Sequence, residues 1–199
     1  MRERPFSEQL EDWLKDHKPK TLESLEQVFA QKSFAMIILL LMAIPALPIP
    51  TGGITHIFEI IVMLLCVELM IGRQFIWLPK KWQKLKLDGK TQDKLLPMLT
   101  KRIRWFERFS KPRLKGLLED PNFLRVIGLI IFVLTFAAFW APPFTGLDTI
   151  PSLGVVIICL SLILEDALLL LIGLIIGGIG VAIEVGIGKG IVEVVKAIF

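Results

Sequence analysis

The sequence predicts an all-α integral membrane protein made of two homologous helical repeats. Three observations predict it. The chain of 199 residues is 54% hydrophobic and has a mean hydropathy of +0.66, whereas soluble domains are about 45–50% apolar. The apolar residues gather in five long runs, and two of these runs carry the same spaced set of turn residues. A soluble bundle of this length would leave too little polar surface to cover five such runs.

The first 32 residues precede every apolar run and carry six Lys/Arg and seven Asp/Glu. A cleavable signal needs a basic start and an apolar stretch together, so we expect the N-terminus to be retained. Leu10, Trp13 and Leu14 share one helical face. After Pro19, a second shared face contains Leu22, Leu25, Val28 and Phe29. Residues 1–32 are therefore predicted to form amphipathic helices at the membrane interface.

The five apolar runs are the candidate membrane segments. A helix needs about 20 apolar residues to cross about 30 Å of hydrocarbon. By this measure the third and fifth runs are long enough, whereas the others are short or interrupted. The number of membrane crossings is therefore left at four or five. The five runs cover residues 33–50, 54–71, 123–143, 150–164 and 167–188.

Residues 73–122 are strongly basic, with 14 Lys/Arg, five Asp/Glu and a net charge of +9. The positive-inside rule places this stretch in the cytoplasm. Within it, residues 102–118 alternate basic and aromatic side chains, which predicts an amphipathic helix on anionic lipid, broken near Pro112. Nucleic-acid binding is the competing interpretation, and we do not expect it beside membrane segments. The predicted units are 1–32, a first membrane repeat at 33–79, a connector at 80–122 and a second membrane repeat at 123–199.

An internal repeat appears when the chain is shifted by 94 residues. Turn residues are scarce in apolar sequence, so a spaced set of matching ones is informative. The matching pairs are Pro48 with Pro142, Thr51 with Thr145, Gly52 with Gly146, and Thr55 with Thr149.

Each repeat is thus two apolar segments joined by a Pro/Thr/Gly break. Proline removes a backbone donor, and backbone groups freed at membrane depth must find partners in protein or water. Matching interrupted segments in two halves indicate a transporter-type site, with re-entrant tips. The alternative is a plain extracytoplasmic turn between short helices. The sequence does not fix whether each repeat crosses the membrane an even or an odd number of times, so both parallel and inverted repeats remain open.

These motifs resemble the ExoD family of exopolysaccharide-synthesis membrane proteins. In the first half the resemblance rests on the run Pro-Ala-Leu-Pro-Ile-Pro at 45–50, followed by Gly52–Gly53, Thr55, Gly72–Arg73 and Trp77-Leu78-Pro79. In the second half it rests on Pro142-Pro143-Phe144, Gly146, Thr149, Pro151 and Glu165-Asp166. The resemblance implies a bacterial inner-membrane protein linked to exopolysaccharide production, which names a process rather than a reaction.

The polar residues near the breaks are candidate binding groups. Threonine hydroxyls there could hold an ion or polar solute, or could bond the freed backbone. Glu59 lies three residues after His56, which suggests either a proton relay or an interfacial hydrogen bond. Glu68, nine residues further on, falls on the opposite helical face.

Three further residues lie at other segment ends. Arg73 could hold an acidic sugar or phosphate, or could anchor the interface. The Glu165-Asp166 pair could bind a cation or cap the last helix. The complete predicted binding set is Pro48, Thr51, Gly52, Thr55, Glu59, Arg73, Pro142, Thr145, Gly146, Thr149, Glu165 and Asp166.

Other motifs narrow the function. No nucleotide-binding loop, zinc site or nucleophile elbow is visible, so we expect no cofactor or metal. An enzyme acting on a lipid-linked sugar is therefore the third hypothesis, after a transporter and a scaffold. Cys66 and Cys159 lie in apolar runs and are expected to be buried reduced thiols. Gly173 and Gly177 have the small-xxx-small spacing that favours close helix packing, between repeats or between protomers.

The sequence therefore predicts a transporter- or channel-like protein of the bacterial inner membrane for a small ion or polar solute. The alternative is a non-transporting scaffold or regulator of polysaccharide synthesis. The expected partners are anionic lipid headgroups, a second copy of the chain and polysaccharide-synthesis proteins.

Overall fold

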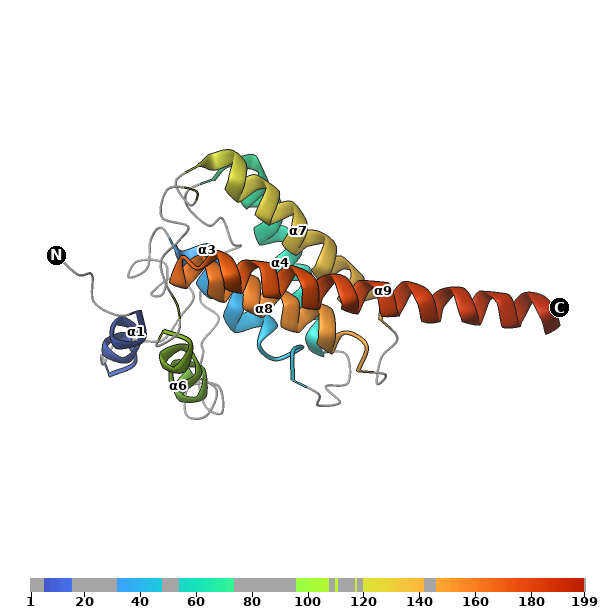
Figure 1. Cartoon of the computed structure of the whole chain (residues 1–199), viewed down its shortest axis with the longest axis horizontal. Helices are drawn as coiled ribbons and strands as arrows, with labels where there is room; N and C mark the ends of the chain where they lie inside the picture. The colour runs from blue at the N-terminus through green and yellow to red at the C-terminus, as the bar shows by residue number, and fades with distance from the viewer. Residues whose placement is uncertain are drawn as a thin grey trace.

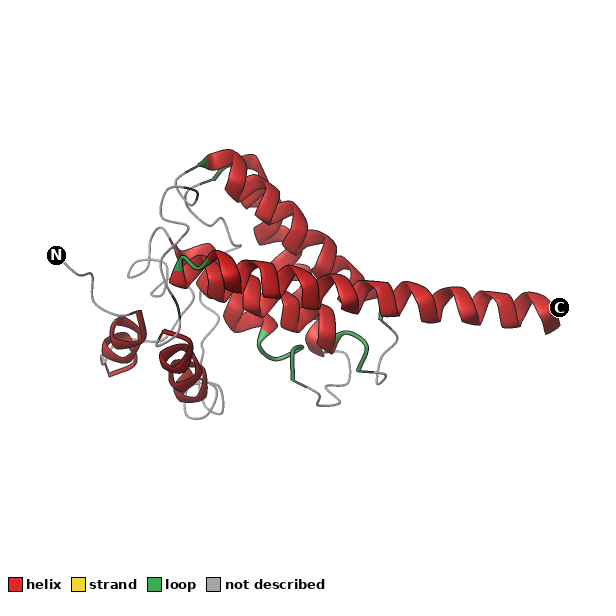
Figure 2. Ribbon diagram, in the orientation of Figure 1, coloured by secondary structure: helices red, strands yellow, loops and turns green. Residues whose placement is uncertain are grey.

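The computed structural model describes residues 6–15, 32–47, 54–73, 96–107, 110, 117, 120–141 and 146–198. Within these residues every regular element is a helix, which confirms the all-α part of the predicted class (Figures 1 and 2). The helices are α1 (Phe6–Lys15), α3 (Ser33–Met42), α4 (Ile54–Ile71), α6 (Leu96–Glu107), α7 (Pro121–Trp140), α8 (Thr149–Leu164) and α9 (Ala167–Ile198).

The helix ends follow from local chemistry. α7 begins at Pro121, where a proline costs no hydrogen bond, and the side chain of Asp120 accepts a hydrogen bond of 2.9 Å from the backbone nitrogen of Asn122. α3 ends at Met42 and gives way to turns that contain the buried Pro45. α9 continues to Ile198, ten residues beyond the apolar run that predicted it.

The predicted start of the connector helix is wrong. We expected the helix to begin at Arg102. Instead α6 begins at Leu96 and has Pro97 in its first turn, where the missing N–H has no partner to lose. Pro112, the expected break, lies outside the described residues.

α1 and α6 pack against each other (Figure 1). The predicted apolar face of α1 is real, because Leu10 and Trp13 are buried. The side chain of Glu107 accepts a hydrogen bond of 2.8 Å from the backbone nitrogen of Ser7, and Arg104 forms an ion pair with Glu11. Residues 16–31, including the second predicted amphipathic helix, lie outside the described residues.

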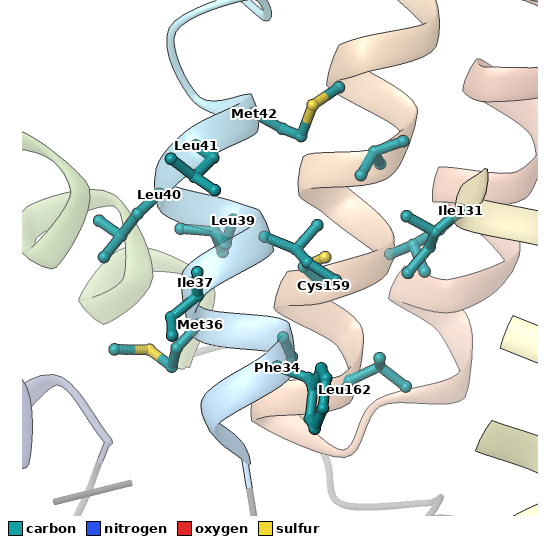
Figure 3. Packing of buried hydrophobic residues seen from close by; sticks show 14 of the residues in the cluster. Phe34, Met36, Ile37, Leu39, Leu40, Leu41, Met42, Ile131, Cys159 and Leu162 are labelled. Atoms are coloured by element: carbon teal, nitrogen blue, oxygen red, sulfur yellow. The ribbon is translucent and has the colours of Figure 1, made fainter. Parts of the chain in front are cut away.

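α3 is the central helix of the bundle, and all ten of its residues are buried. It packs against α4 and α8. Figure 3 shows Phe34 and Met42 of α3 directed towards α8, with Cys159 and Leu162 on the facing side. At about 15 Å this helix is too short to cross a bilayer by itself.

Glycines bring α8 and α9 into backbone contact. A methyl group on Gly154 of α8 would lie 2.6 Å from the backbone nitrogen of Gly177, and one on Gly173 would lie 2.9 Å from the nitrogen of Ile158. A methyl group on Gly177 would also meet Leu134 of α7 at 2.7 Å. The predicted close packing therefore occurs within the chain. Gly178 and Gly186, on the other side of α9, face open space.

The outer faces of the bundle are apolar along whole helices. α7 and residues 167–187 of α9 are long and apolar enough to cross a membrane, as the third and fifth runs predicted. Only about a third of each span is buried, unlike the core helix of a soluble protein. The exposed stripes contain Ile57, Ile60, Leu64, Val67 and Ile71 on α4; Val126, Leu129, Val133, Phe136 and Trp140 on α7; and Leu168, Leu171, Ile175, Ile179 and Ile183 on α9.

Gly154→Ala tests the α8–α9 contact. The added methyl group overlaps the Gly177 backbone, which cannot move without separating the helices, so we expect a loss of about 1–3 kcal/mol in the free energy of unfolding. The measurement is denaturant or thermal unfolding of the purified protein. Gly178→Ala is the matched control, since its methyl group enters open space, and equal losses in both variants would contradict the contact.

Candidate functional site

The most buried carboxylate of the bundle lies at the start of α4. The side chain of Glu59 has 0% of its surface exposed. Its Oε2 atom lies 2.8 Å from Nδ1 of His56, and its Oε1 atom has no hydrogen-bond partner. The ring of His56 is partly exposed and contacts the ring of Phe139 at the end of α7, with centroids 5.2 Å apart. The predicted hydrogen bond between His56 and Glu59 is therefore present.

Two further carboxylates join this pair from other parts of the chain. Asp148, directly before α8, lies within electrostatic range of His56 and Glu59. Glu184 of α9 lies within electrostatic range of Asp148 and Glu59, and its Oε1 atom is buried without a hydrogen-bond partner. We call His56, Glu59, Asp148 and Glu184 the acidic cluster.

The environment of Asp148 disfavours its charged form. Burial raises the pKa of the Asp148 carboxyl, while its backbone hydrogen bonds and the charge of His56 oppose this rise. A carboxylate that leaves water without a full counter-charge is costly to ionise.

Local sequence positions each member. On α4, the outward stripe that includes Ile57 and Ile60 leaves Glu59 on the inward face. Gly146 has a left-handed φ of 69°, and its carbonyl accepts a hydrogen bond of 3.3 Å from the nitrogen of Thr149, which turns the chain into α8. Gly180 lies against Pro151, where a methyl group would be 2.6 Å from the proline nitrogen. Glu184 follows one turn later, at the level of Asp148.

Two buried hydroxyl groups lie deeper in the bundle than the acidic cluster. Ser152 of α8 and Thr135 of α7 are fully buried, and neither hydroxyl oxygen has a hydrogen-bond partner. Ser152 is next to Pro151, which touches Gly180, and Thr135 is next to Leu134, which faces Gly177. These contacts place the two hydroxyls one to two turns deeper than Glu184. We call Ser152 and Thr135 together with the acidic cluster the polar column.

The structure brings only part of the predicted binding set together. Thr55, Glu59, Gly146 and Thr149 lie at the end of the bundle that holds the acidic cluster, and Thr55 is buried. The remaining residues of the predicted breaks, Pro48, Thr51, Gly52, Pro142 and Thr145, lie outside the described residues.

Arg73, Glu165 and Asp166 lie at the opposite end of the bundle. Arg73 follows Glu59 by 14 residues, which is about 21 Å along a helix. Glu165 ends α8 with a left-handed φ of 57° and forms an ion pair of 3.0 Å with Lys32. Lys32 also donates a hydrogen bond of 2.8 Å to the carbonyl of Ile163.

Asp166 begins α9. Its Oδ1 atom accepts a hydrogen bond of 2.9 Å from the backbone nitrogen of Leu168. This is the geometry of a helix N-cap, the simpler of the two predicted roles for the residue.

Sequence reasoning left Asp148 and Glu184 out of the predicted set. A usable signal existed for Glu184, because it continues the 173, 177, 180 spacing of the glycine face. Asp148 directly precedes Thr149, which the repeat had singled out, but its neighbours could not be known before the fold.

The composition of the cluster limits what it can hold. In the described part of the chain no three His, Cys, Asp or Glu side chains lie close enough together to hold a metal ion. Cys66 and Cys159 are buried free thiols, as expected. The polar groups that the cluster offers are carboxyl oxygens and one imidazole.

Comparison with known proteins assigns the chain to a protein family. The family described as "Exopolysaccharide synthesis, ExoD" matches residues 6–186, which include the whole acidic cluster. The chain belongs to the ExoD family. Membership associates it with exopolysaccharide synthesis. An uncharacterized protein of Synechocystis sp. is 28% identical over 98% of this chain and 89% of its own length. No solved structure matches this ExoD protein.

Two variants of Asp166 separate a cap from a ligand. Asp166→Ala removes the acceptor and is expected to lower the free energy of unfolding by about 1 kcal/mol, whereas Asp166→Asn keeps a capping oxygen and is expected to be nearly neutral. Unfolding of both purified variants measures this. A role for Asp166 as a cation ligand would be indicated if the Asn variant lost a cation-dependent stabilisation that the natural protein shows.

Proposed function

We propose that this ExoD protein is a multi-pass protein of the bacterial inner membrane with transporter-like activity towards a small ion or polar solute. The observation that carries the proposal is the polar column. Buried carboxyl and hydroxyl oxygens without partners lie inside a bundle whose outer faces are apolar. Ionisable groups inside membrane helices are costly and mark ion or substrate pathways.

The outward apolar stripes support the membrane location. On α4 and α7 each stripe extends over about 21 Å, and on α9 over about 22 Å. Contiguous apolar surface of this size is rare on soluble monomers. The polar residues lie instead on the inner faces, which is the arrangement that lipid favours and water opposes.

The helix contacts support the internal repeat. A shift of 94 residues moves α4 onto 148–165, close to α8 at 149–164, and moves α3 onto 127–136, within α7. If the halves are exchanged, the contact of α3 with α8 becomes that of α7 with α4, and the contact of α3 with α4 becomes that of α7 with α8. All four contacts are present. The contact pattern is therefore compatible with a pseudo-twofold relation between the halves.

Helix directions favour parallel repeats. Gly128 of α7 faces Leu69 and Cys66 of α4, and Gly72 faces Arg125, so α4 and α7 are antiparallel. α3 packs against α4 and is joined to it by a short break, so these two helices are antiparallel as well. α3 and α7 therefore run in the same direction, and the two repeats start from the same side. The strongly basic connector joins α4 to α7, and the positive-inside rule then puts that side in the cytoplasm.

This topology assigns the acidic cluster to the extracytoplasmic half of the bundle. The deeper core is apolar and closed by α3, Cys66 and Cys159. A solute that enters the polar column would meet this barrier, so passage requires the packed helices to shift. Alternating access of this kind is typical of transporters built from repeats, and an open channel is less compatible with the packing.

A second candidate function is a scaffold for polysaccharide-synthesis proteins at the cytoplasmic face. The observation that favours it is the outer surface of α6, which exposes Lys101, Arg102 and Trp105 while its other side holds α1. Such a surface suits anionic headgroups or an acidic partner. The scaffold requires no polar path through the bundle, so a flux measurement distinguishes the two.

Flux through proteoliposomes tests the transporter. We expect the purified protein to accelerate movement of at least one small ion or neutral solute, and Ser152→Leu to abolish the acceleration, because it replaces a hydroxyl of the polar column with an apolar side chain. Leu153→Ile, at the adjacent outward-facing position, is the matched control and should keep full flux. The absence of flux for every small ion and neutral solute tested, or full flux in Ser152→Leu, would contradict the proposal and leave the scaffold.

A further inference from the structure

The acidic cluster has more negative than positive groups. Three carboxyl groups lie within electrostatic range of one another: Glu59 from α4, Asp148 from the start of α8 and Glu184 from α9. The imidazole of His56 lies within range of Glu59 and Asp148. α7 contributes Phe139 and Thr135, which do not titrate, and α3 carries no titratable side chain. Within the described residues no lysine or arginine pairs with these carboxyl groups.

Ionisation of all three carboxyl groups at once is strongly unfavourable in these buried surroundings. Like charges placed close together disfavour the ionised form of one another, and one imidazolium compensates at most one of them. The Oε1 atoms of Glu59 and Glu184 are buried and lack any hydrogen-bond donor. An ionised oxygen in that position would lose its hydration without replacement, whereas a protonated carboxyl carries no charge to hydrate.

We infer that the acidic cluster is a proton-binding site, in which Glu59 holds the proton and His56 connects it to water. The inference rests on the proposed function and names the ion that the site takes. His56 is partly exposed, and its Nδ1 lies 2.8 Å from the buried Oε2 of Glu59. A proton taken from water by the imidazole passes along this hydrogen bond to the carboxylate. The imidazole returns to its neutral form, the carboxylate becomes a neutral acid, and the pair changes from a net charge of −1 to zero.

The same charges exclude other ligands. Each ionised carboxyl group of the cluster repels anions, and no lysine or arginine of the described residues pairs with it, so sugar phosphates and other acidic polysaccharide precursors do not fit the acidic cluster. The geometry also lacks a three-ligand metal group within the described residues. A proton is therefore the chemically suited ion, either as the transported species or as the coupling ion for another solute.

Labelling with dicyclohexylcarbodiimide tests the proton site without measuring flux. This apolar reagent reacts with protonated carboxyl groups in apolar surroundings. In membranes that contain the full chain, mass spectrometry should find modification at Glu59 that decreases as the pH rises. Glu59→Gln should remove the signal. Glu68, on the opposite face of the same helix, is the internal reference, and Glu68→Gln should leave modification of Glu59 unchanged.

The outcomes separate the inference from the proposed function. No modification of Glu59 at any pH, or modification of Glu68 to the same extent, would overturn the proton site, and solute flux that Glu59→Gln leaves unchanged would agree with that result while keeping the transporter. Modification of Glu59 that falls with rising pH supports the proton site even where proteoliposomes show no flux, in which case only the transport proposal fails. The labelling of the natural protein carries the test if Glu59→Gln does not fold.

Discussion

The hydrogen bond between His56 and the fully buried Glu59 is the interaction on which this account depends. A carboxylate is among the least favourable groups to place in an apolar interior, and it remains there only with a partner or a proton. Here the partner is one residue of the same helix, and the second oxygen has none. The outer face of that helix is apolar throughout. The polar groups of this helix therefore lie inside the bundle and its apolar groups lie outside. This arrangement fits a bundle surrounded by lipid and a function that needs a polar interior.

Close packing makes this interior possible. Gly154, Gly173, Gly177 and Gly180 let α8 and α9 approach until their backbones touch. That approach sets the register of α9, which in turn brings Glu184 within electrostatic range of Asp148 and Glu59. The glycine contacts and the acidic cluster are thus linked, because a change that separates α9 from α8 also removes one carboxyl group from the cluster. The glycines contribute no chemical group to the cluster; they act by setting how closely α8 and α9 pack.

The sequence was sufficient for the features that depend on local pattern. The helical class, the two long spans, the pairing of His56 with Glu59 and the close glycine packing all follow from spacing along one or two helices. It was insufficient where segments far apart in the chain meet. Asp148 and Glu184 were left out, since nothing in the sequence shows that α9 returns past the start of α8. Arg73, Glu165 and Asp166 were included in one predicted binding set with the residues of the breaks, although helix lengths place them at the opposite end of the bundle. The start of α6 was predicted too late in the chain, because the helix also includes Pro97, which the first turn tolerates.

The most direct measurement concerns neighbouring residues that point in opposite directions. Ser152 is fully buried on the polar column, while Leu153 is 38% exposed on the apolar surface. In a background with Cys66→Ala and Cys159→Ala, single cysteines at the two positions are exposed to a charged thiol reagent in intact membranes. The account predicts that the buried Ser152→Cys reacts, because the helix shift that transport requires opens the polar column to water, and that the exposed Leu153→Cys does not, because lipid covers it. Rapid reaction at Leu153→Cys with none at Ser152→Cys, the pattern of a soluble protein, would contradict it.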